Sequence, residues 1–226
     1  MISGETRLVG LLGDPVSQSL SPVMQNAAFA ARGLDWAYVP LHVTSERLED
    51  ALRGLVALGF VGANVTTPHK LAVANLIDAD DPSLNTLVVG DGGVTGYSTD
   101  AAVLSELEFK RAVILGDGGA AAAFKVAVPD AAHFSRKGSW PPDVSDDDLV
   151  VNATSERDEV LVELGAGQIL VDLPYPRTAT ARAAEAAGAR VVDGLEVLVA
   201  QGAASFELWT GVPAPVDVMR AAVRSA

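Results

Sequence analysis

The chain has 226 residues, of which 49% are hydrophobic and 20% charged, so it holds enough apolar material for a folded core and too little charge for a disordered chain. It contains no cysteine, which excludes disulfide bonds, thiol nucleophiles and thiolate metal sites. Its formal net charge of −13 repels nucleic acid, so any anion site has to be built locally from helix N-termini, hydroxyls and a few cations.

The first half of the chain alternates short apolar runs with helical patterns. Ser21-Pro22 predicts the start of a helix, with Ser21 as its N-cap, and Gly33 marks its end. Two more helices are expected over residues 48–58 and 68–77. Strands are expected over residues 7–12, 37–43 and 60–65, followed by a hairpin with strands at 87–89 and 94–97.

The second half restarts the same alternation. Strands are expected over residues 112–115, 131–134, 149–151, 169–172 and 190–192, and helices after Gly119, over 179–188 and over 195–209. Residues 137–148, with two prolines and three consecutive aspartates, predict an exposed loop. Because strands that alternate with helices form parallel sheets with right-handed crossovers, the sequence predicts an α/β fold.

Hydroxyl and amide side chains follow two of the expected strands. Ser19 and Ser21, beside a helix N-terminus, suit a carboxylate ligand, although Ser21 as a simple N-cap explains the same pattern. The run Asn-Val-Thr-Thr-Pro-His-Lys at residues 64–70 ends on Lys70, and a partly desolvated lysine there is a usable acid or base. A capped helix with a solvated lysine explains that run equally well.

A carboxylate at another strand end is a candidate partner for the lysine. Asp100 either caps a helix or, paired with Lys70, orients the lysine and shares its proton. Asn85 precedes the same hairpin. His69 is expected on the surface or in a supporting position, and no partner histidine or carboxylate cluster indicates a metal site.

A glycine-rich turn, Gly116-Asp117-Gly118-Gly119-Ala120, separates an apolar strand from an alanine-rich helix. Such a turn lets the backbone approach a pyrophosphate at the helix N-terminus, although the full G-x-G-x-x-G form is absent. About twenty residues further on, an NAD site would place an acidic residue for the ribose. Here the strand ends in Ser135-Arg136-Lys137, and two cations without a carboxylate favour the 2′-phosphate of NADP.

Taken in order, these segments resemble the shikimate dehydrogenase family over residues 10–219. The most specific markers are Ser-Leu-Ser-Pro at 19–22, the run at 64–70, Asn85-Thr86, Gly-Tyr-Ser-Thr-Asp at 96–100, Asn-Ala-Thr at 152–154, Asp-Gly-Leu at 193–195 and Gln-Gly-Ala-Ala-Ser-Phe-Glu-Leu-Trp-Thr-Gly at 201–211. The resemblance implies two α/β domains with a cleft between them. Residues 1–100 plus 195–226 would form a substrate-binding and catalytic domain with a parallel-type sheet, and residues 101–194 a small Rossmann-like NADP-binding domain.

The resemblance also implies an activity and a role for each matching residue. The activity is the reversible, NADP-dependent reduction of 3-dehydroshikimate to shikimate, a step toward chorismate and the aromatic amino acids. The catalytic pair would be Lys70 and Asp100. The substrate would be bound by Ser19, Ser21, Asn64, Thr66, Asn85, Tyr175 and Gln201. The cofactor would be bound by Gly116, Asp117, Gly118, Gly119, Ala120, Ser135, Arg136, Lys137, Leu173 and Gly194.

Nearly every departure from the family pattern falls on the cofactor side. Asp117 stands where alanine is usual, Val197 where methionine is usual, and Ser-Glu-Arg-Asp-Glu at 155–159 replaces a glycine-methionine pair. The segment from Gly116 to Ser135 is also shorter than the family's. Two alternatives therefore stay open. One is a quinate or related hydroxy-acid dehydrogenase of the same family, with NAD as an option. The other is a homologue that binds the ring acid without catalysis.

The remaining expectations concern the setting of the protein. No apolar stretch reaches the roughly 18 residues that a membrane helix needs. Residues 1–12 lack the basic start and cleavage site of a signal peptide. We expect a cytoplasmic monomer or homodimer that binds a small-molecule substrate and neither membrane nor nucleic acid.

Overall fold

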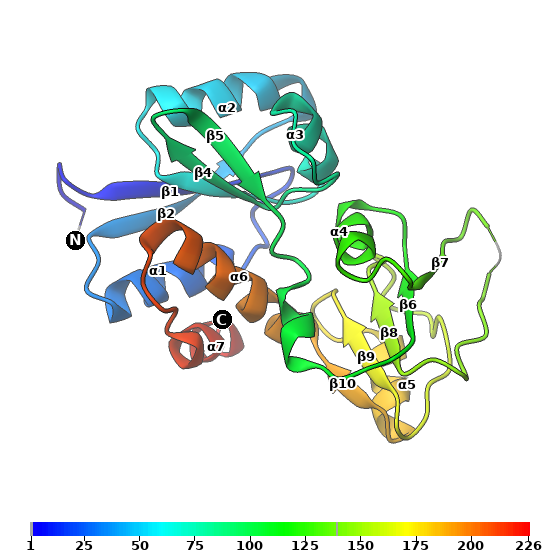
Figure 1. Ribbon diagram of the computed structural model, residues 1–226. Coiled ribbons are helices and arrows are strands. Elements are labelled where there is room, and N and C mark those ends of the chain that lie inside the picture. Colours follow the sequence, from blue (N-terminus) through cyan, green and yellow to red (C-terminus); the bar gives the residue numbers. More distant parts are fainter. Residues whose placement is uncertain (1, 139) are drawn as a thin grey trace. The chain divides into compact units, whose positions relative to one another are not determined.

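The computed structural model describes residues 2–138 and 140–226, and the chain divides into two compact units (Figure 1). Unit 1 consists of Met1–Thr99 and Val199–Ala226, and unit 2 consists of Asp100–Leu198. The C-terminal segment therefore returns to the unit that the N-terminal segment begins.

Unit 1 is built on a five-stranded sheet of order β2-β1-β3-β4-β5. The strands are β1 (Arg7–Gly13), β2 (Trp36–His42), β3 (Gly62–Val65), β4 (Thr86–Gly90) and β5 (Gly93–Tyr97). β1 pairs in parallel with β2 and β3, whereas β4 is antiparallel to β3 and forms the predicted hairpin with β5. The sheet is therefore mixed: β1, β2 and β3 are parallel, and β4 and β5 add an antiparallel hairpin at one edge.

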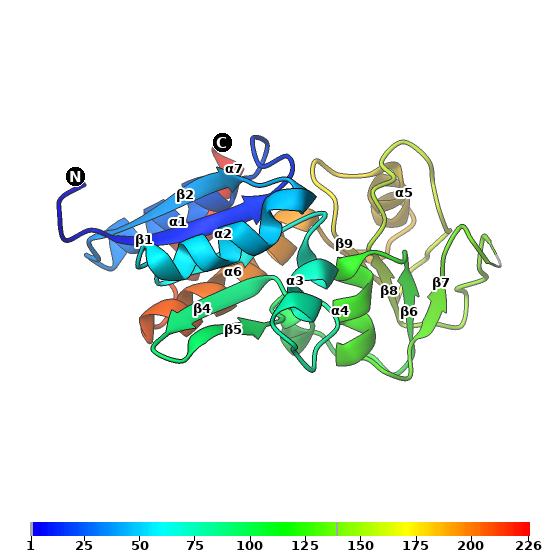
Figure 2. The ribbon, with the colours of Figure 1, turned by 90° about the horizontal axis from the view of Figure 1, so that it is seen from above.

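Helices cover both faces of this sheet. The helices that contribute to unit 1 are α1 (Ser21–Ala31), α2 (Leu48–Ala57), α3 (Lys70–Leu76), α6 (Gly194–Thr210, from residue 199) and α7 (Val216–Arg224), with a 3-10 turn at Ser45–Arg47. α2 and α3 lie on one face, α1 and the C-terminal helices on the other, and α7 packs beside α1 (Figures 1 and 2). Leu12, Leu52 and Leu87 belong to the core under α2 and α3. Phe29 of α1 stacks on Phe206 of α6 with ring centres 5.5 Å apart.

Unit 2 is a parallel sheet of order β10-β9-β8-β6-β7. The strands are β6 (Ala112–Leu115), β7 (Ala132–Phe134), β8 (Leu149–Asn152), β9 (Ile169–Asp172) and β10 (Arg190–Val192), and the helices are α4 (Gly119–Ala127) and α5 (Ala179–Ala186), with a 3-10 turn at Ala102–Glu106. Every residue of β6 and β8 is buried, as strands in the middle of a parallel sheet require. This is the Rossmann-like arrangement predicted for the second half.

The segment between β7 and β8 differs in part from the exposed loop predicted over residues 137–148. Its described residues form neither helix nor strand, as expected, and residue 139 lies outside them. Val144, however, is only 3% exposed and packs into the core of unit 2 with Leu164 and Leu170. The prediction of exposure was wrong at this valine because the surrounding aspartates and prolines dominate the local composition.

Candidate functional site

The turn that leads into α1 carries two serine side chains, Ser19 and Ser21. The backbone N–H of Ser21 donates to Ser19 Oγ at 3.2 Å, and Ser21 is buried. Ser21 is the first residue of the helix, and the N-cap is Leu20, which makes no side-chain cap hydrogen bond. The prediction that Ser21 is the N-cap was therefore wrong by one position, because Pro22 fits the second helical position as well as the first. The two hydroxyls lie at a helix N-terminus, where a carboxylate is stabilised.

A buried hydrogen-bond network joins β3, β4 and α6 around Asn64. Asn64 Oδ1 accepts from the hydroxyl of Tyr38 at 2.8 Å. Its Nδ2 lies 2.9 Å from the carbonyl oxygen of Asn85, 3.1 Å from Thr86 Oγ1 and 3.0 Å from Ser205 Oγ. The amide of Asn64 is thus already bound on both its oxygen and its nitrogen, so this side chain is part of the fold as well as a candidate ligand.

Asn85 extends the same network toward Gln201. Its Nδ2 donates to Thr99 Oγ1 at 2.9 Å and to Gln201 Oε1 at 3.1 Å, and its Oδ1 accepts the backbone N–H of Thr99 at 2.7 Å. The structure therefore brings together Asn64, Asn85 and Gln201, three of the predicted substrate ligands. The connecting hydroxyls of Thr86, Thr99 and Ser205 lay within the quoted motifs but were not predicted as site residues, and only the pairing of the strands places them together.

The turn between β3 and α3 carries Thr66 and Lys70. Thr66 donates its backbone N–H to the carbonyl oxygen of Leu12 on β1 at 2.8 Å, which fixes the turn at the carboxyl end of the parallel strands. Lys70 is half-buried and begins α3, while His69 is the N-cap residue. His69 is only 1% exposed, and its Nε2 lies 2.6 Å from the carbonyl oxygen of Val43. His69 was expected either on the surface or in a supporting position. The surface position was wrong, and the structure shows a buried, supporting histidine.

Asp100 immediately follows Thr99 and is 7% exposed. Thr99 is held by Asn85 through its backbone N–H and by the carbonyl oxygen of Gln201, which accepts from Thr99 Oγ1 at 3.1 Å. The chain leading to this carboxylate is therefore anchored by the residues predicted to bind the substrate. A buried carboxylate next to a rigid anchor point has the limited freedom that an orienting group needs.

The glycine-rich turn of unit 2 runs from the end of β6 into α4. Gly116 has φ +121°, and an added Cβ would lie 2.8 Å from the carbonyl oxygen of Ala153, so only glycine fits there. At Gly118, in contrast, an added Cβ would meet nothing within 4 Å. The backbone over the N-terminus of the nine-residue α4 is thus open, and with Gly119 and Ala120 it fits a pyrophosphate.

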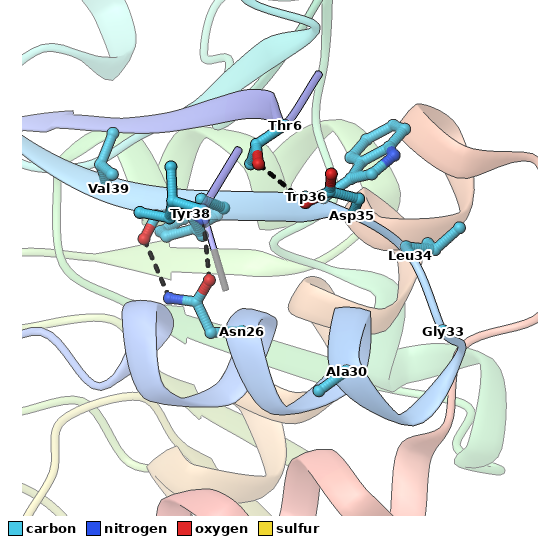
Figure 3. Close-up of a pocket in the computed structure, with 11 residues that line it drawn as sticks. Thr6, Asn26, Ala30, Gly33, Leu34, Asp35, Trp36, Tyr38 and Val39 are labelled. Carbon is cyan, nitrogen blue, oxygen red and sulfur yellow. Dashed lines mark hydrogen bonds between the residues drawn. The ribbon is translucent and has the colours of Figure 1, made fainter. Parts of the chain in front are cut away.

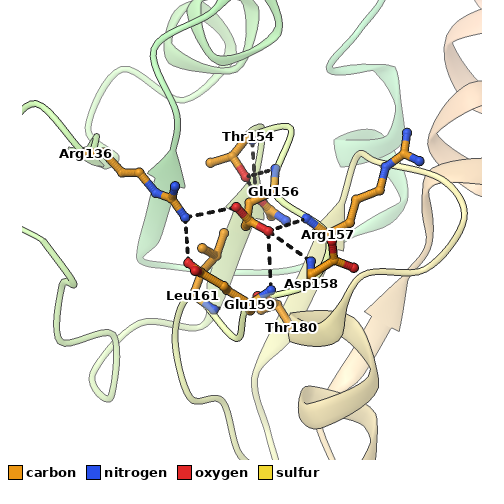
Figure 4. Close-up of polar contacts among 9 residues, drawn as sticks. Arg136, Thr154, Glu156, Arg157, Asp158, Glu159, Leu161 and Thr180 are labelled. Carbon is orange, nitrogen blue, oxygen red and sulfur yellow. Dashed lines mark hydrogen bonds and ion pairs between the residues drawn. The ribbon is translucent and has the colours of Figure 1, made fainter.

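The two cations expected for the 2′-phosphate are bound by carboxylates of unit 2, and Figure 4 shows those around Arg136. Arg136 Nη2 lies 3.1 Å from Glu156 Oε2 and 2.9 Å from Glu159 Oε2. Lys137 Nζ lies 2.6 Å from Asp117 Oδ2, and this contact lowers the pKa of Asp117 and raises that of Lys137. Ser135, at the end of the same strand, is half-buried. The sequence showed no carboxylate beside these cations because the partners lie 20 or more positions away along the chain.

The ends of β8 and β9 form a second buried polar group. Asn152 Nδ2 donates to Asp172 Oδ1 at 2.7 Å, and the hydroxyl of Thr178 donates to the same oxygen at 3.1 Å. Burial raises the pKa of Asp172, and these hydrogen bonds oppose the shift. Leu173 and Gly194 lie next to each other, since a Cβ added to Gly194 would be 2.6 Å from the carbonyl oxygen of Leu173. Tyr175, two residues further on, is half-buried.

A hollow of about 670 Å³ lies elsewhere in unit 1, beside β2 and α1 (Figure 3). Asn26 closes part of it by donating to the carbonyl oxygen of Tyr38 and accepting its backbone N–H, both at 2.9 Å. These bonds occupy backbone groups of the edge strand β2 that would otherwise face solvent. None of the predicted site residues lines this hollow.

Two negative findings concern the described residues alone. Among residues 2–138 and 140–226, no group of three or more histidine, aspartate or glutamate side chains could hold a metal ion. In the same part of the chain, no helix combines the length and apolar character needed to cross a membrane.

The fold and these groups define a class: a two-unit α/β protein with a dinucleotide-type turn in one unit and a buried polar site in the other. Residues 11–86 match the shikimate dehydrogenase substrate binding domain, and residues 194–224 match the shikimate 5′-dehydrogenase C-terminal domain. A shikimate dehydrogenase (NADP(+)) of Anaeromyxobacter dehalogenans is 40% identical, covering 98% of this chain and 97% of its own. The chain belongs to the shikimate dehydrogenase family.

Solved structures agree with this assignment. A crystal structure of a shikimate dehydrogenase in complex with NADP+ matches with a TM-score of 0.89 at 30% identity, covering 100% of this chain and 97% of that one. A shikimate 5-dehydrogenase from Thermus thermophilus, in complex with NADP(H) and shikimate, matches with a TM-score of 0.83 at 27% identity, covering 97% and 99%. The alignment with the Anaeromyxobacter relative runs over 270 positions, more than the 226 residues of this chain, so the relative has residues without a counterpart here.

Proposed function

We propose that this protein catalyses the reversible, NADP-dependent reduction of 3-dehydroshikimate to shikimate. The observation that carries the proposal is the buried network of unit 1, in which Asn64, Asn85 and Gln201 lie together around shared hydroxyls. The Anaeromyxobacter relative and the Thermus structure both carry shikimate dehydrogenase in their names, and the Thermus structure contains NADP(H) and shikimate. These are the two ligands that we propose for this protein.

The substrate contacts follow from the placement of the polar groups of unit 1. Ser19 and Ser21, at the N-terminus of α1, bind the ring carboxylate, because hydroxyls and a helix N-terminus stabilise an anion even on an acidic protein. Asn64, Thr66, Asn85 and Gln201 bind the ring hydroxyls, and Tyr175 contacts the substrate as well. Because the amides of Asn64 and Asn85 are already paired, each ring hydroxyl shares or replaces one of their internal hydrogen bonds.

Lys70 and Asp100 form the proposed acid–base pair. During reduction, the Lys70 ammonium gives a proton to the carbonyl oxygen of the substrate as that oxygen becomes an alkoxide, and during oxidation the amine takes the proton back. Asp100 orients the lysine and shares its proton. Proton transfer by a positioned side chain typically contributes about 10²–10⁴ to the rate.

The cofactor residues of unit 2 fit a dinucleotide. When bound, NADP supplies or accepts the hydride. The backbone of residues 116–120 receives the pyrophosphate, since Gly116 fixes the turn and Gly118 leaves it open. Ser135, Arg136 and Lys137 hold the adenosine end, and Leu173 and Gly194 lie near the nicotinamide. Asp117 remains beside this turn as the partner of Lys137.

A spectrophotometric assay of shikimate and quinate, each with NADP and with NAD, tests the proposal. We expect shikimate with NADP to be the fastest combination. Faster turnover of quinate would make the protein a quinate dehydrogenase of the same family. Faster turnover of shikimate with NAD would make NAD its cofactor. Calorimetric titration separates the enzyme from a ring-acid-binding homologue. Shikimate binding without NADP binding at millimolar concentration would contradict an enzymatic role.

A further inference from the structure

The two carboxylates that bind Arg136 are held in different ways. Glu159 has a side chain that is 71% exposed, whereas that of Glu156 is 23% exposed. Glu156 Oε1 accepts the backbone N–H groups of Arg157 and Asp158, both at 3.0 Å, and that of Glu159 at 3.4 Å (Figure 4). Its other oxygen, Oε2, accepts from Arg136. One carboxylate is therefore fixed by the backbone and the other is free to turn into solvent.

The backbone amides also keep Glu156 charged. They lower its pKa, with the amide of Asp158 as the largest cause, and the positive charge of Arg136 acts in the same direction. To leave Arg136, Glu156 would have to give up several amide contacts. Glu159 would give up only an exposed ion pair, which contributes little to stability.

This arrangement resembles an anion site that the protein fills with its own side chain. Consecutive backbone N–H groups and an arginine are the donors that proteins use to bind phosphate. Here Glu156 occupies them. A 2′-phosphate that approaches Arg136 has to share the guanidinium with a fixed negative charge, and a phosphate monoester itself carries about −1.5 to −2 charges at neutral pH. The second cation, Lys137, is shared in the same way with Asp117.

We propose that Glu156 is a specificity-determining residue that lowers the preference of this chain for a dinucleotide carrying a 2′-phosphate. The inference rests on the proposed function, because it presupposes a nicotinamide dinucleotide bound to unit 2 with its adenosine end at Arg136. It predicts that NADP binds less tightly, relative to NAD, than Arg136 alone would allow.

The test is equilibrium binding of NADPH and NADH to the full-length protein, followed by cofactor fluorescence. Glu156→Gln keeps an oxygen for the backbone amides and removes the charge. We expect the dissociation constant for NADPH to fall about tenfold and that for NADH to change by less than about twofold, since removing one like charge beside a bound phosphate changes an affinity by about that factor. Displacement of bound NADPH by 2′,5′-ADP should improve by the same factor.

Asp158→Asn is the matched control. It removes one exposed carboxylate from the same turn, keeps the amide that Glu156 uses and leaves the contacts of Arg136 in place. We expect it to change the affinities for NADPH and NADH equally. If it favours NADPH as strongly as Glu156→Gln does, the overall charge of the turn sets the preference and the proposal fails.

The remaining outcomes separate this inference from the proposed function. Equal changes for NADPH and NADH in Glu156→Gln would overturn the role of Glu156 while leaving the enzyme assignment intact. Binding of neither dinucleotide by the natural protein would overturn the assignment and the inference together. If circular dichroism shows that Glu156→Gln does not fold, Glu156→Asp is the second test, because it keeps the charge that the backbone amides bind and shortens the side chain that reaches Arg136. A higher affinity for NADPH alone then supports the proposal, and an unchanged ratio of the NADPH and NADH affinities contradicts it.

Discussion

The polar groups of the two units are stabilised in different ways. In unit 1 the candidate ligands Asn64 and Asn85 are 4% and 2% exposed. Their side chains form neutral hydrogen bonds, that of Asn64 with the carbonyl oxygen of Asn85 and that of Asn85 with the hydroxyl of Thr99. In unit 2 the candidate ligands Arg136 and Lys137 have side chains that are 55% and 86% exposed and bind carboxylates. A change in the first set alters the core, whereas a change in the second alters mainly the local charge. With the roles proposed for these residues, substrate recognition is coupled to folding, and cofactor preference can change without affecting folding.

The largest expected effect concerns Lys70. Lys70→Ala should lower kcat by about 10²–10⁴, because a proton-transfer group acts mainly in the transition state. The dissociation constant of shikimate, measured by calorimetry, should change far less. Lys125→Ala, which removes an exposed lysine from α4, is the control and should leave kcat unchanged.

The coupling between Lys70 and Asp100 can be measured in the same assay. Asp100→Asn should lower kcat by a similar or smaller factor, and the double variant should be little worse than the worse single variant, since residues that act as one unit are not additive. Additive losses would show that the two residues act independently. Normal turnover with weaker shikimate binding in Lys70→Ala would make the lysine a hydroxyl ligand.

A substitution of Asn64 tests whether the polar residues of unit 1 contribute to the free energy of unfolding. Asn64→Ala removes the acceptor of the Tyr38 hydroxyl and one of the two donors to the carbonyl oxygen of Asn85, which keeps the backbone N–H of Val65, and should lower the free energy of unfolding by about 1–3 kcal/mol. Urea unfolding at pH 7 measures this loss. Lys137→Ala in unit 2, which removes an exposed partner of Asp117, is the contrasting variant and should leave the unfolding midpoint unchanged. A destabilised Lys137 variant would break the proposed division between the units.

Two glycines of one turn separate folding from cofactor binding within unit 2. Gly116→Ala should lower the free energy of unfolding by about 1–3 kcal/mol. The alanine would have to adopt a positive φ, and its Cβ would press against the carbonyl oxygen of Ala153. Gly118→Ala should leave stability almost unchanged and weaken NADPH binding, because its Cβ enters the open space over the helix. Thermal unfolding and NADPH titration of both variants check this. Equal effects of the two variants on NADPH affinity after correction for folding would argue against a pyrophosphate at Gly118.

Much of this division could be predicted from the sequence, but its key contacts could not. Apolar runs located β6 and β9 to the residue, because buried strands of a parallel sheet are nearly continuous hydrophobic segments. The edge strand β10 was located to the residue as well, although only Val192 in it is buried. The hydroxyl-rich motifs likewise indicated which side chains gather in unit 1. The pairing of Arg136 with Glu156 and Glu159 could not be predicted, although the acidic run at 155–159 was visible. A sequence shows which charges exist, whereas the strand order decides which of them meet.

The smallest expected effect concerns Asp172, a charged residue of unit 2 that is buried, unlike Arg136 and Lys137. Burial raises its pKa above the ordinary value of 3.8, so the folded protein binds more protons than the unfolded chain at pH values between 3.8 and the raised pKa. The free energy of unfolding must therefore decrease as the pH rises through that window, by about 1.4 kcal/mol for each unit between the two pKa values. Asp172→Asn cannot titrate, so the stability of the natural protein relative to this variant should fall between pH 4 and pH 7 in urea titrations. A difference that stays level above pH 4 and decreases as the pH falls below 3.8 would mean that the bonds from Asn152 and Thr178 outweigh burial and hold the pKa below 3.8.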